Sequence, residues 1–173
     1  QTPHIVVNII RNDNYDHFTF YDLPVKPSPN LPNIQSIYAY PTTCFFEGTV
    51  LSEGRGTDKP FLVFGHPSLP ENLYSFTPNP NAGAKNSKNY GQVNYGWNVS
   101  GTVEEVFNKV DNQIQLGWIL EAYKQFPDKD SFFIIPKNGK MEGSFFNKLA
   151  GNNELWQQIK AGKSEAEIRK SWE

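Results

Sequence analysis

Four prolines within residues 22–33, DLPVKPSPNLPN, constrain the fold of this chain more than any other feature. Each proline fixes its own φ and favours an extended conformation in the residue before it, so a regular helix is excluded here. We therefore expect a stiff, extended strap. The strap is either a plain linker or a rigid support that presents Ser28 and Asn30 at a fixed place.

The segment before the strap is short. Residues 5–10, IVVNII, are rich in β-branched side chains and predict a buried strand, and a polar loop follows at residues 11–17. We expect His4 and His17, which flank these pieces, at the surface or in linkers. Because Gln1 is not an initiator and no signal peptide follows it, we expect a mature product or a piece of a longer protein.

Composition and charge narrow the class of protein. The 173 residues are 38% hydrophobic and 14% aromatic, which suits one domain with its own core. A net charge of −2 without a basic stripe argues against nucleic-acid binding, and no apolar run reaches the length of a membrane span. Cys44 lies among apolar neighbours, so we expect a buried thiol rather than a nucleophile. We expect neither a metal nor a cofactor.

The remaining patterns predict an α+β fold with a small mixed or antiparallel sheet, packed helices and a helical C-terminal tail. Helical segments are expected at residues 33–40, 41–46, 112–126, 143–150, 152–162 and 164–172. Strands or extended pieces are expected at residues 49–57, 61–64, 73–77 and 131–135, with a long loop over residues 68–90. In the longest helix, Asp111 or Asn112 is the expected cap, and Pro127 ends the helix.

Aromatic side chains alternate with glycines in residues 90–98, YGQVNYGWN. Tyr90, Tyr95 and Trp97 either form a stacking wall for a sugar or pack over the sheet. The residues alone leave these two interpretations open.

Polar groups gather in an otherwise apolar and glycine-rich stretch, residues 45–67. It contains Glu47, Arg55 and His66, and buried charges are costly unless they are paired. We expect Glu47 to be the only acid removed from water, since Glu53 and Asp58 have polar neighbours. Gly54 and Gly56 permit positive φ or a close approach of a ligand, but the pattern lacks the third glycine of a dinucleotide-binding fingerprint.

Three motifs taken together point to a family: PSPNLPN, SIYAYPTTCFFEGT and GRGTDKPFLVFGHP. With these, and with AGKSEAEIRKSW near the end, the chain resembles the C-terminal part of the bacterial exo-β-N-acetylmuramidases, glycoside hydrolases of peptidoglycan recycling. The resemblance extends over most of the chain, and the order of the motifs is its specific feature.

The resemblance implies that residues 1–173 form a single auxiliary domain of a two-domain protein. A Rossmann-like N-terminal domain would carry the essential catalytic residues, with the active-site cleft between the domains. The partners implied are that N-terminal domain and peptidoglycan fragments or muropeptides that end in N-acetylmuramic acid. The implied location is periplasmic or secreted. We expect the chain to be inactive without the other domain.

The family's motif positions in this sequence are Ser28, Asn30, Glu47, Thr49, Arg55, Thr57 and His66. Glu47 is the candidate catalytic carboxyl group, or else a support for such a group; the others are candidates for substrate binding. Arg55 would bind the lactyl carboxylate of N-acetylmuramic acid, hold Glu47 in place, or pair structurally with Glu47 or Asp58. His66 would donate a hydrogen bond at the cleft rim or be purely structural.

Two other classes of function remain open. One is a stand-alone carbohydrate-binding or protein-interaction module. The other is a scaffolding domain in which every polar group of residues 45–67 is paired internally.

Overall fold

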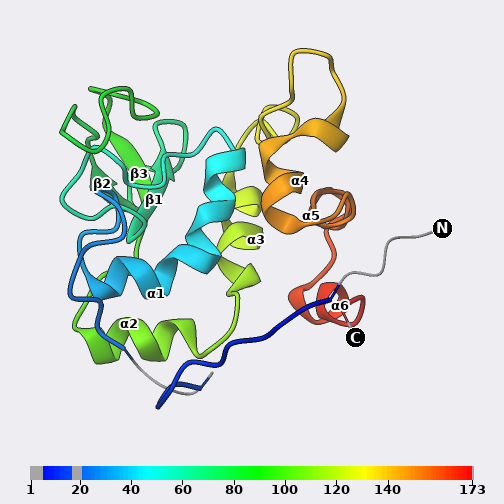
Figure 1. Ribbon diagram of the computed structural model, residues 1–173. Helices are drawn as coiled ribbons and strands as arrows, with labels where there is room; N and C mark the ends of the chain where they lie inside the picture. The colour runs from blue at the N-terminus through cyan, green and yellow to red at the C-terminus, as the bar shows by residue number, and fades with distance from the viewer. Residues whose placement is uncertain (1–5, 17–20, 173) are drawn as a thin grey trace.

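A computed structural model describes residues 6–16 and 21–172 of the chain, and the fold is α+β as expected. A small antiparallel sheet lies with α1 and α2 at one end of the molecule, and α4, α5 and α6 lie at the other, with α3 between them (Figure 1). The strands are β1 (Val63–His66), β2 (Tyr74–Phe76) and β3 (Asn94–Asn98). The α-helices are α1 (Ile34–Thr43), α2 (Val103–Val110), α3 (Leu116–Gln125), α4 (Phe145–Ala150), α5 (Leu155–Lys160) and α6 (Glu165–Arg169), and the 3-10 helices are η1 (Cys44–Gly48) and η2 (Met141–Gly143).

The sheet has the order β1-β3-β2, with β3 in the centre. Gly65 of β1 faces Gly96 of β3, where a Cβ at Gly96 would collide with the carbonyl oxygen of Phe64. β2 confirms the short strand predicted within residues 73–77. The strand predicted at residues 49–57 is reduced to isolated bridges, from Ser52 to Gly65 and from Thr49 to Phe133.

A column of aromatic rings forms the centre of the core. Phe46 of η1 stacks on Phe64 of β1 with ring centroids 4.3 Å apart. Phe64 in turn stacks on Trp97 of β3 at 5.5 Å and on Trp118 of α3 at 6.0 Å. These contacts fix η1 against both the sheet and α3, and η1 is the element that carries Glu47.

Helix α1 continues through Pro41, so the break predicted at that residue is wrong. Its start is fixed by Asn33, whose side-chain oxygen accepts a hydrogen bond from the backbone N–H of Ser36 at 2.9 Å. Proline removes one backbone donor, but Ala39, Thr42 and Thr43 around it are buried. We attribute the continuity of the helix to this packing, which offsets the missing hydrogen bond.

The helix predicted at residues 112–126 begins only at Leu116, and α2 precedes it without having been predicted. Asp111 does not cap α3; it ends α2 in the left-handed conformation, with φ of 48°. Asn112 follows with φ of 51°, so the chain turns here before α3 starts. The predicted end is confirmed, since α3 stops at Gln125, before Pro127.

The helical tail follows the sequence prediction closely. α4 and α5 are followed by Gly151 and Gly162, both at positive φ, and Ser164 with Glu167 forms the expected capping box of α6. Residues 131–135 contribute only the bridge of Phe133.

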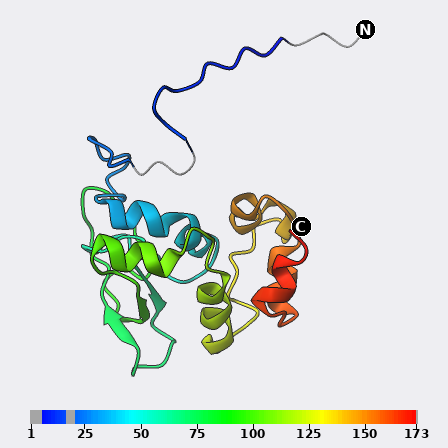
Figure 2. The same ribbon diagram turned by 90° about the horizontal axis from the view of Figure 1, so that it is seen from below.

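The strand predicted at residues 5–10 is not formed by residues 6–10, which are exposed and not part of any sheet within the described ranges. Figure 2 shows this segment running away from the folded body. Residue 5, His4 and His17 lie outside the described residues. The strap at residues 22–33 contains no helix before Ile34, as its prolines predict.

Candidate functional site

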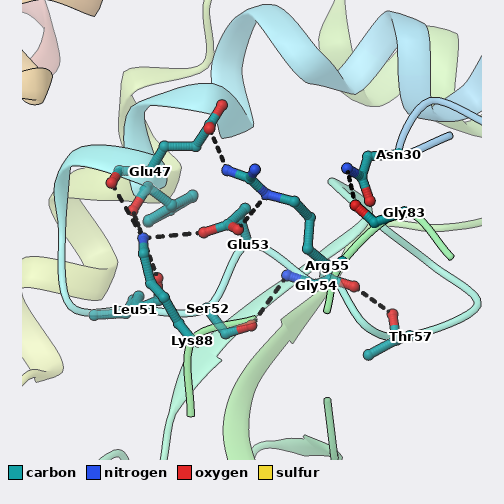
Figure 3. A network of polar contacts seen from close by, with 12 residues as sticks. Asn30, Glu47, Leu51, Ser52, Glu53, Gly54, Arg55, Thr57, Gly83 and Lys88 are labelled. Carbon is teal, nitrogen blue, oxygen red and sulfur yellow. Dashed lines mark hydrogen bonds and ion pairs between the residues drawn. The ribbon is translucent and has the colours of Figure 1, made fainter. Parts of the chain in front are cut away.

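Arg55 is the centre of a cluster of charged side chains (Figure 3). Its Nη2 donates a hydrogen bond to the carboxylate of Glu47, and its Nε donates to Oε1 of Glu53 at 2.7 Å. One guanidinium group thus connects a carboxylate from η1 with a carboxylate from the following loop. The predicted contact of Arg55 with Glu47 is present.

The turn that carries Arg55 depends on its two flanking glycines. Gly54 and Gly56 have φ of 80° and 84°, where other residues are strained, and a Cβ at either would lie within 3 Å of neighbouring atoms. Thr57 closes the turn by donating from Oγ1 to the carbonyl of Gly54 at 2.7 Å. Thr49 is fully buried and donates to the carbonyl of Phe46 at 2.9 Å. Both threonine side chains therefore support the loop that holds the cluster.

Lys88 completes the cluster, and it was not among the site residues predicted from the sequence. Its Nζ lies 3.0 Å from Oε2 of Glu53. It also donates to the backbone carbonyls of Phe46 at 2.7 Å, Leu51 at 3.0 Å and Glu47 at 3.2 Å. The ammonium group of Lys88 therefore connects the loop between β2 and β3 both to η1 and to the residues that follow η1.

The burial of Glu53 shows that one prediction from the sequence is wrong. Its side chain is only 3% exposed, so Glu47 is not the only acid removed from water. The sequence neighbours of Glu53 are polar, but its actual surroundings are set by Lys88, which is distant in the sequence. A local pattern contains no information on such a partner.

The four charges balance one another. Burial raises the pKa of Glu47, although Arg55 opposes this shift. Burial lowers the pKa of Lys88, although Glu53 opposes this shift. Burial would lower the pKa of Arg55, but Glu53 and Glu47 outweigh it and raise that pKa. With two carboxyl groups and two basic groups in contact, the cluster carries no formal net charge.

The cluster borders a pocket of about 350 Å³. It is lined by Glu53, Arg55 and the loop of residues 83–88. The side chains of Arg55 and Glu47 are 31% and 13% exposed, so both remain within reach of solvent. The cluster is therefore not a sealed structural ion pair.

The proline strap is attached to the rim of this pocket. Asn30 donates from Nδ2 to the carbonyl of Gly83 at 2.8 Å, and its backbone N–H donates to Oγ of Ser28 at 3.2 Å. A Cβ on Gly83 would lie 2.8 Å from Oδ1 of Asn30. The strap and the pocket loop consequently fit against each other at Gly83 (Figure 3).

His66 is not joined to this cluster. Its ring packs edge-on against Phe126 with centroids 5.0 Å apart, and its Nδ1 accepts a hydrogen bond from the backbone N–H of Ser68 at 3.1 Å. Burial lowers its pKa. Within residues 6–16 and 21–172, no hydrogen bond or ion pair connects His66 to Glu47 or Arg55. The structure thus brings together the acid and the guanidinium, but not the imidazole.

The structure also places the aromatic residues of segment 90–98 and Cys44, which the sequence analysis considered. Trp97 stacks on Phe64, and Tyr95 packs against the core, whereas Tyr90 is 57% exposed. Packing over the sheet is thus the interpretation that fits Tyr95 and Trp97. Cys44 is buried, and burial raises its pKa to about 11, which disfavours the reactive thiolate.

The described part of the chain shows neither a metal-binding group of side chains nor a membrane-spanning helix. No group of three His, Cys, Asp or Glu side chains gathers there as a metal site would require. No helix there has the length and apolar character needed to cross a membrane.

Comparison with known proteins shows the family of the chain. The family model described as the C-terminal region of exo-β-N-acetylmuramidase NamZ matches residues 38–173. The peptidoglycan β-N-acetylmuramidase NamZ of Bacillus subtilis is 33% identical over 166 residues, a match that covers 86% of this chain and 36% of that protein. A crystal structure of a DUF1343 family protein from Bacteroides fragilis superimposes with a TM-score of 0.80 at 41% identity, covering 93% of this chain and 42% of that one.

The chain spans well under half the length of either relative. Because the family model matches residues 38–173, the chain belongs to the family of NamZ exo-β-N-acetylmuramidase C-terminal domains.

Proposed function

We propose that this domain forms one wall of the active-site cleft of a peptidoglycan exo-β-N-acetylmuramidase. The other wall would be a preceding domain of the same polypeptide, and the substrate would be a peptidoglycan fragment that ends in N-acetylmuramic acid. Two facts support the proposal: the family match is to a C-terminal region, and the Bacillus relative is named for this activity. Since peptidoglycan lies outside the cytoplasmic membrane, a periplasmic or secreted location follows from the proposal.

The observation that carries the proposal is the arrangement of Arg55 beside the pocket. Its Nε and Nη2 are committed to Glu53 and Glu47, whereas Nη1 donates no hydrogen bond to any residue in the described ranges. The Arg55 side chain is 31% exposed and lines the pocket, and in this proposal Nη1 is the donor that binds a carboxylate. N-acetylmuramic acid differs from N-acetylglucosamine by a lactyl ether that carries such a carboxylate. Arginine is well suited to bind it, and the exposed Lys85 adds positive charge at the same pocket.

Glu47 is the residue that we assign to proton transfer or to the support of proton transfer. Glycosidases generally use two carboxyl groups, and one of them often has a raised pKa. Burial raises the pKa of Glu47, and Arg55 fixes its position. In this proposal its partner carboxyl group lies in the preceding domain.

The experiment compares two substrates in the two-domain protein. Arg55→Lys should weaken the cleavage of a muramic acid substrate at least about tenfold more than that of the matching glucosamine analogue, since a lost charged hydrogen bond costs about 1.5–3 kcal/mol. Lys160→Ala is the matched control, because Lys160 pairs with Asp130, outside the cluster. An equal loss of cleavage on both substrates would contradict the proposal that Arg55 binds the lactyl carboxylate.

A stand-alone carbohydrate-binding module is the second candidate, because the pocket is already formed within this chain. Titration of the 173-residue chain with N-acetylmuramic acid separates the two functions. Binding at millimolar concentration or below supports the module. An absence of binding, together with activity of the two-domain protein, supports a half-site that depends on the other domain.

A further inference from the structure

We infer that residues 6–10 form a strand in the sheet of the preceding domain, so that this chain supplies part of its partner's core. The inference rests on the proposed function to the extent that it places the chain in a two-domain polypeptide. It goes further by naming the segment that joins the two domains and the type of sheet that receives it.

The exposure of this segment is the first observation. Val6, Val7, Ile9 and Ile10 are 82%, 74%, 82% and 94% exposed. A run of aliphatic side chains this exposed is unusual in a folded protein and marks a surface that another structure covers. The backbone groups of residues 6–10 also form no hydrogen bond with any described residue, which leaves both sides of the segment open for pairing.

The sequence of the segment specifies the kind of partner. In a strand, successive side chains point to opposite faces, so Val6 and Val7 would lie on different faces, as would Ile9 and Ile10. One face would carry Val7 and Ile9, and the other Val6 and Ile10 with Asn8 between them, so both faces are predominantly apolar. Strands of this kind occur in parallel sheets that helices cover on both sides, whereas a sheet with one wet face shows alternation of apolar and polar residues. The antiparallel sheet of this domain does not fit, because Tyr74 and Ser75 on its edge strand β2 are exposed.

The position of the segment agrees with this partner. The match to the C-terminal family begins at residue 38, so residues 6–10 lie upstream of it, and both relatives are much longer than this chain. The segment runs away from the folded body, and the strap of residues 22–33 separates the two (Figure 2). Between residues 12–15 and α1 there is an open hollow of about 770 Å³, with Leu23, Ile34 and Ile37 in its lining. A domain built around residues 6–10 would lie next to this hollow.

Amide hydrogen exchange tests the inference without any reference to activity. The amides of residues 7–10 should exchange at least about 1,000-fold more slowly in the two-domain protein than in the 173-residue chain, where they should exchange like those of an unfolded peptide. The amides of β3 serve as the internal reference and should be protected in both. Equal, fast exchange of residues 7–10 in both proteins would overturn the inference.

A substitution provides the second arm. Ile9→Asp should lower the melting temperature of the two-domain protein and leave that of the 173-residue chain unchanged, because Ile9 makes no core contact within this domain. The matched control is Asn12→Asp, which introduces the same charge in the following turn. A concentration-dependent dimer of the 173-residue chain that Ile9→Asp abolishes would identify a second copy as the partner and would also overturn the inference. Protection of residues 7–10 in a protein without muramidase activity would leave the inference standing while the proposed function fails.

Discussion

The ammonium group of Lys88 lies 3.0 Å from the carboxylate of Glu53, and this pair connects a long surface loop to the base of the charged cluster. Glu53 is nearly inaccessible, and Lys88 is 24% exposed at its side chain. The pair explains how a carboxylate beside a glycine-rich turn can be buried at all, since an unpaired charge in that position would be strongly destabilising.

Lys88→Met should lower the free energy of unfolding by about 3 kcal/mol, because it leaves a buried carboxylate without one of its two cations. It also removes the donor to the carbonyls of Phe46 and Leu51. Denaturant unfolding of the 173-residue chain measures the change. Lys85→Met, on the same loop but exposed, should change the stability by less than about 0.5 kcal/mol. Similar values for the two variants would mean that the pair contributes little.

Gly54→Ala should destabilise the domain by more than about 1 kcal/mol, since alanine is strained at φ of 80° and its Cβ would lie 2.7 Å from the carbonyl oxygen of Lys59. Thermal unfolding provides the measurement. Gly143→Ala is the matched control, because no atom lies within 4 Å of the added Cβ and its φ is not positive. A harmless Gly54→Ala would show that the turn around Arg55 can adopt another conformation.

His66 should make the stability depend on pH. Burial lowers its pKa below the ordinary value near 6.5, so the folded state favours the neutral ring. As the pH falls below 6.5, the unfolded chain takes up the proton first, and stability is lost until the pH falls below the pKa of the folded state. His66→Asn keeps an acceptor for the N–H of Ser68 but cannot titrate. Free energies of unfolding at pH 7.5, 6 and 5 should therefore fall less in the variant than in the original chain, and parallel curves would contradict this expectation.

Cys44 should react slowly with alkylating reagents. Its pKa is raised from 9.0 to about 11 by burial, so the thiolate fraction at pH 8 falls about 100-fold. It is the single cysteine of the chain, so the rate of iodoacetamide incorporation reports on it alone. The rate should rise to that of an ordinary thiol in denaturant. Equal rates in the folded and unfolded states would show that the site opens easily.

Local patterns predicted the parts of the fold that depend on local contacts. The capping box at Ser164 and Glu167 marked the start of α6, and Pro127 marked the end of α3. The same type of signal, Thr102 with Glu105 before Val106, was present for α2 and was overlooked. In that case the information was in the sequence, and the error lay in its interpretation.

The failures have a different physical origin. The burial of Glu53 depends on Lys88, and a loop brings the two together only when the whole domain folds. Residues 6–10 have the pattern of a strand, but a pattern does not say which sheet the strand joins. The pairing of Glu47 with Arg55 could be predicted because both residues lie in one short polar stretch. His66 belongs to the same stretch, but it contacts Phe126 and Ser68 instead.

The column of stacked rings links η1 to tryptophan side chains whose fluorescence can be measured. Phe46 precedes Glu47 directly, and its ring connects through Phe64 to two of the four tryptophans, Trp97 and Trp118. A sugar or a neighbouring domain that displaces Glu47 would disturb this column and with it the emission of both indoles. Intrinsic fluorescence could therefore follow events at the charged cluster in real time, without a label.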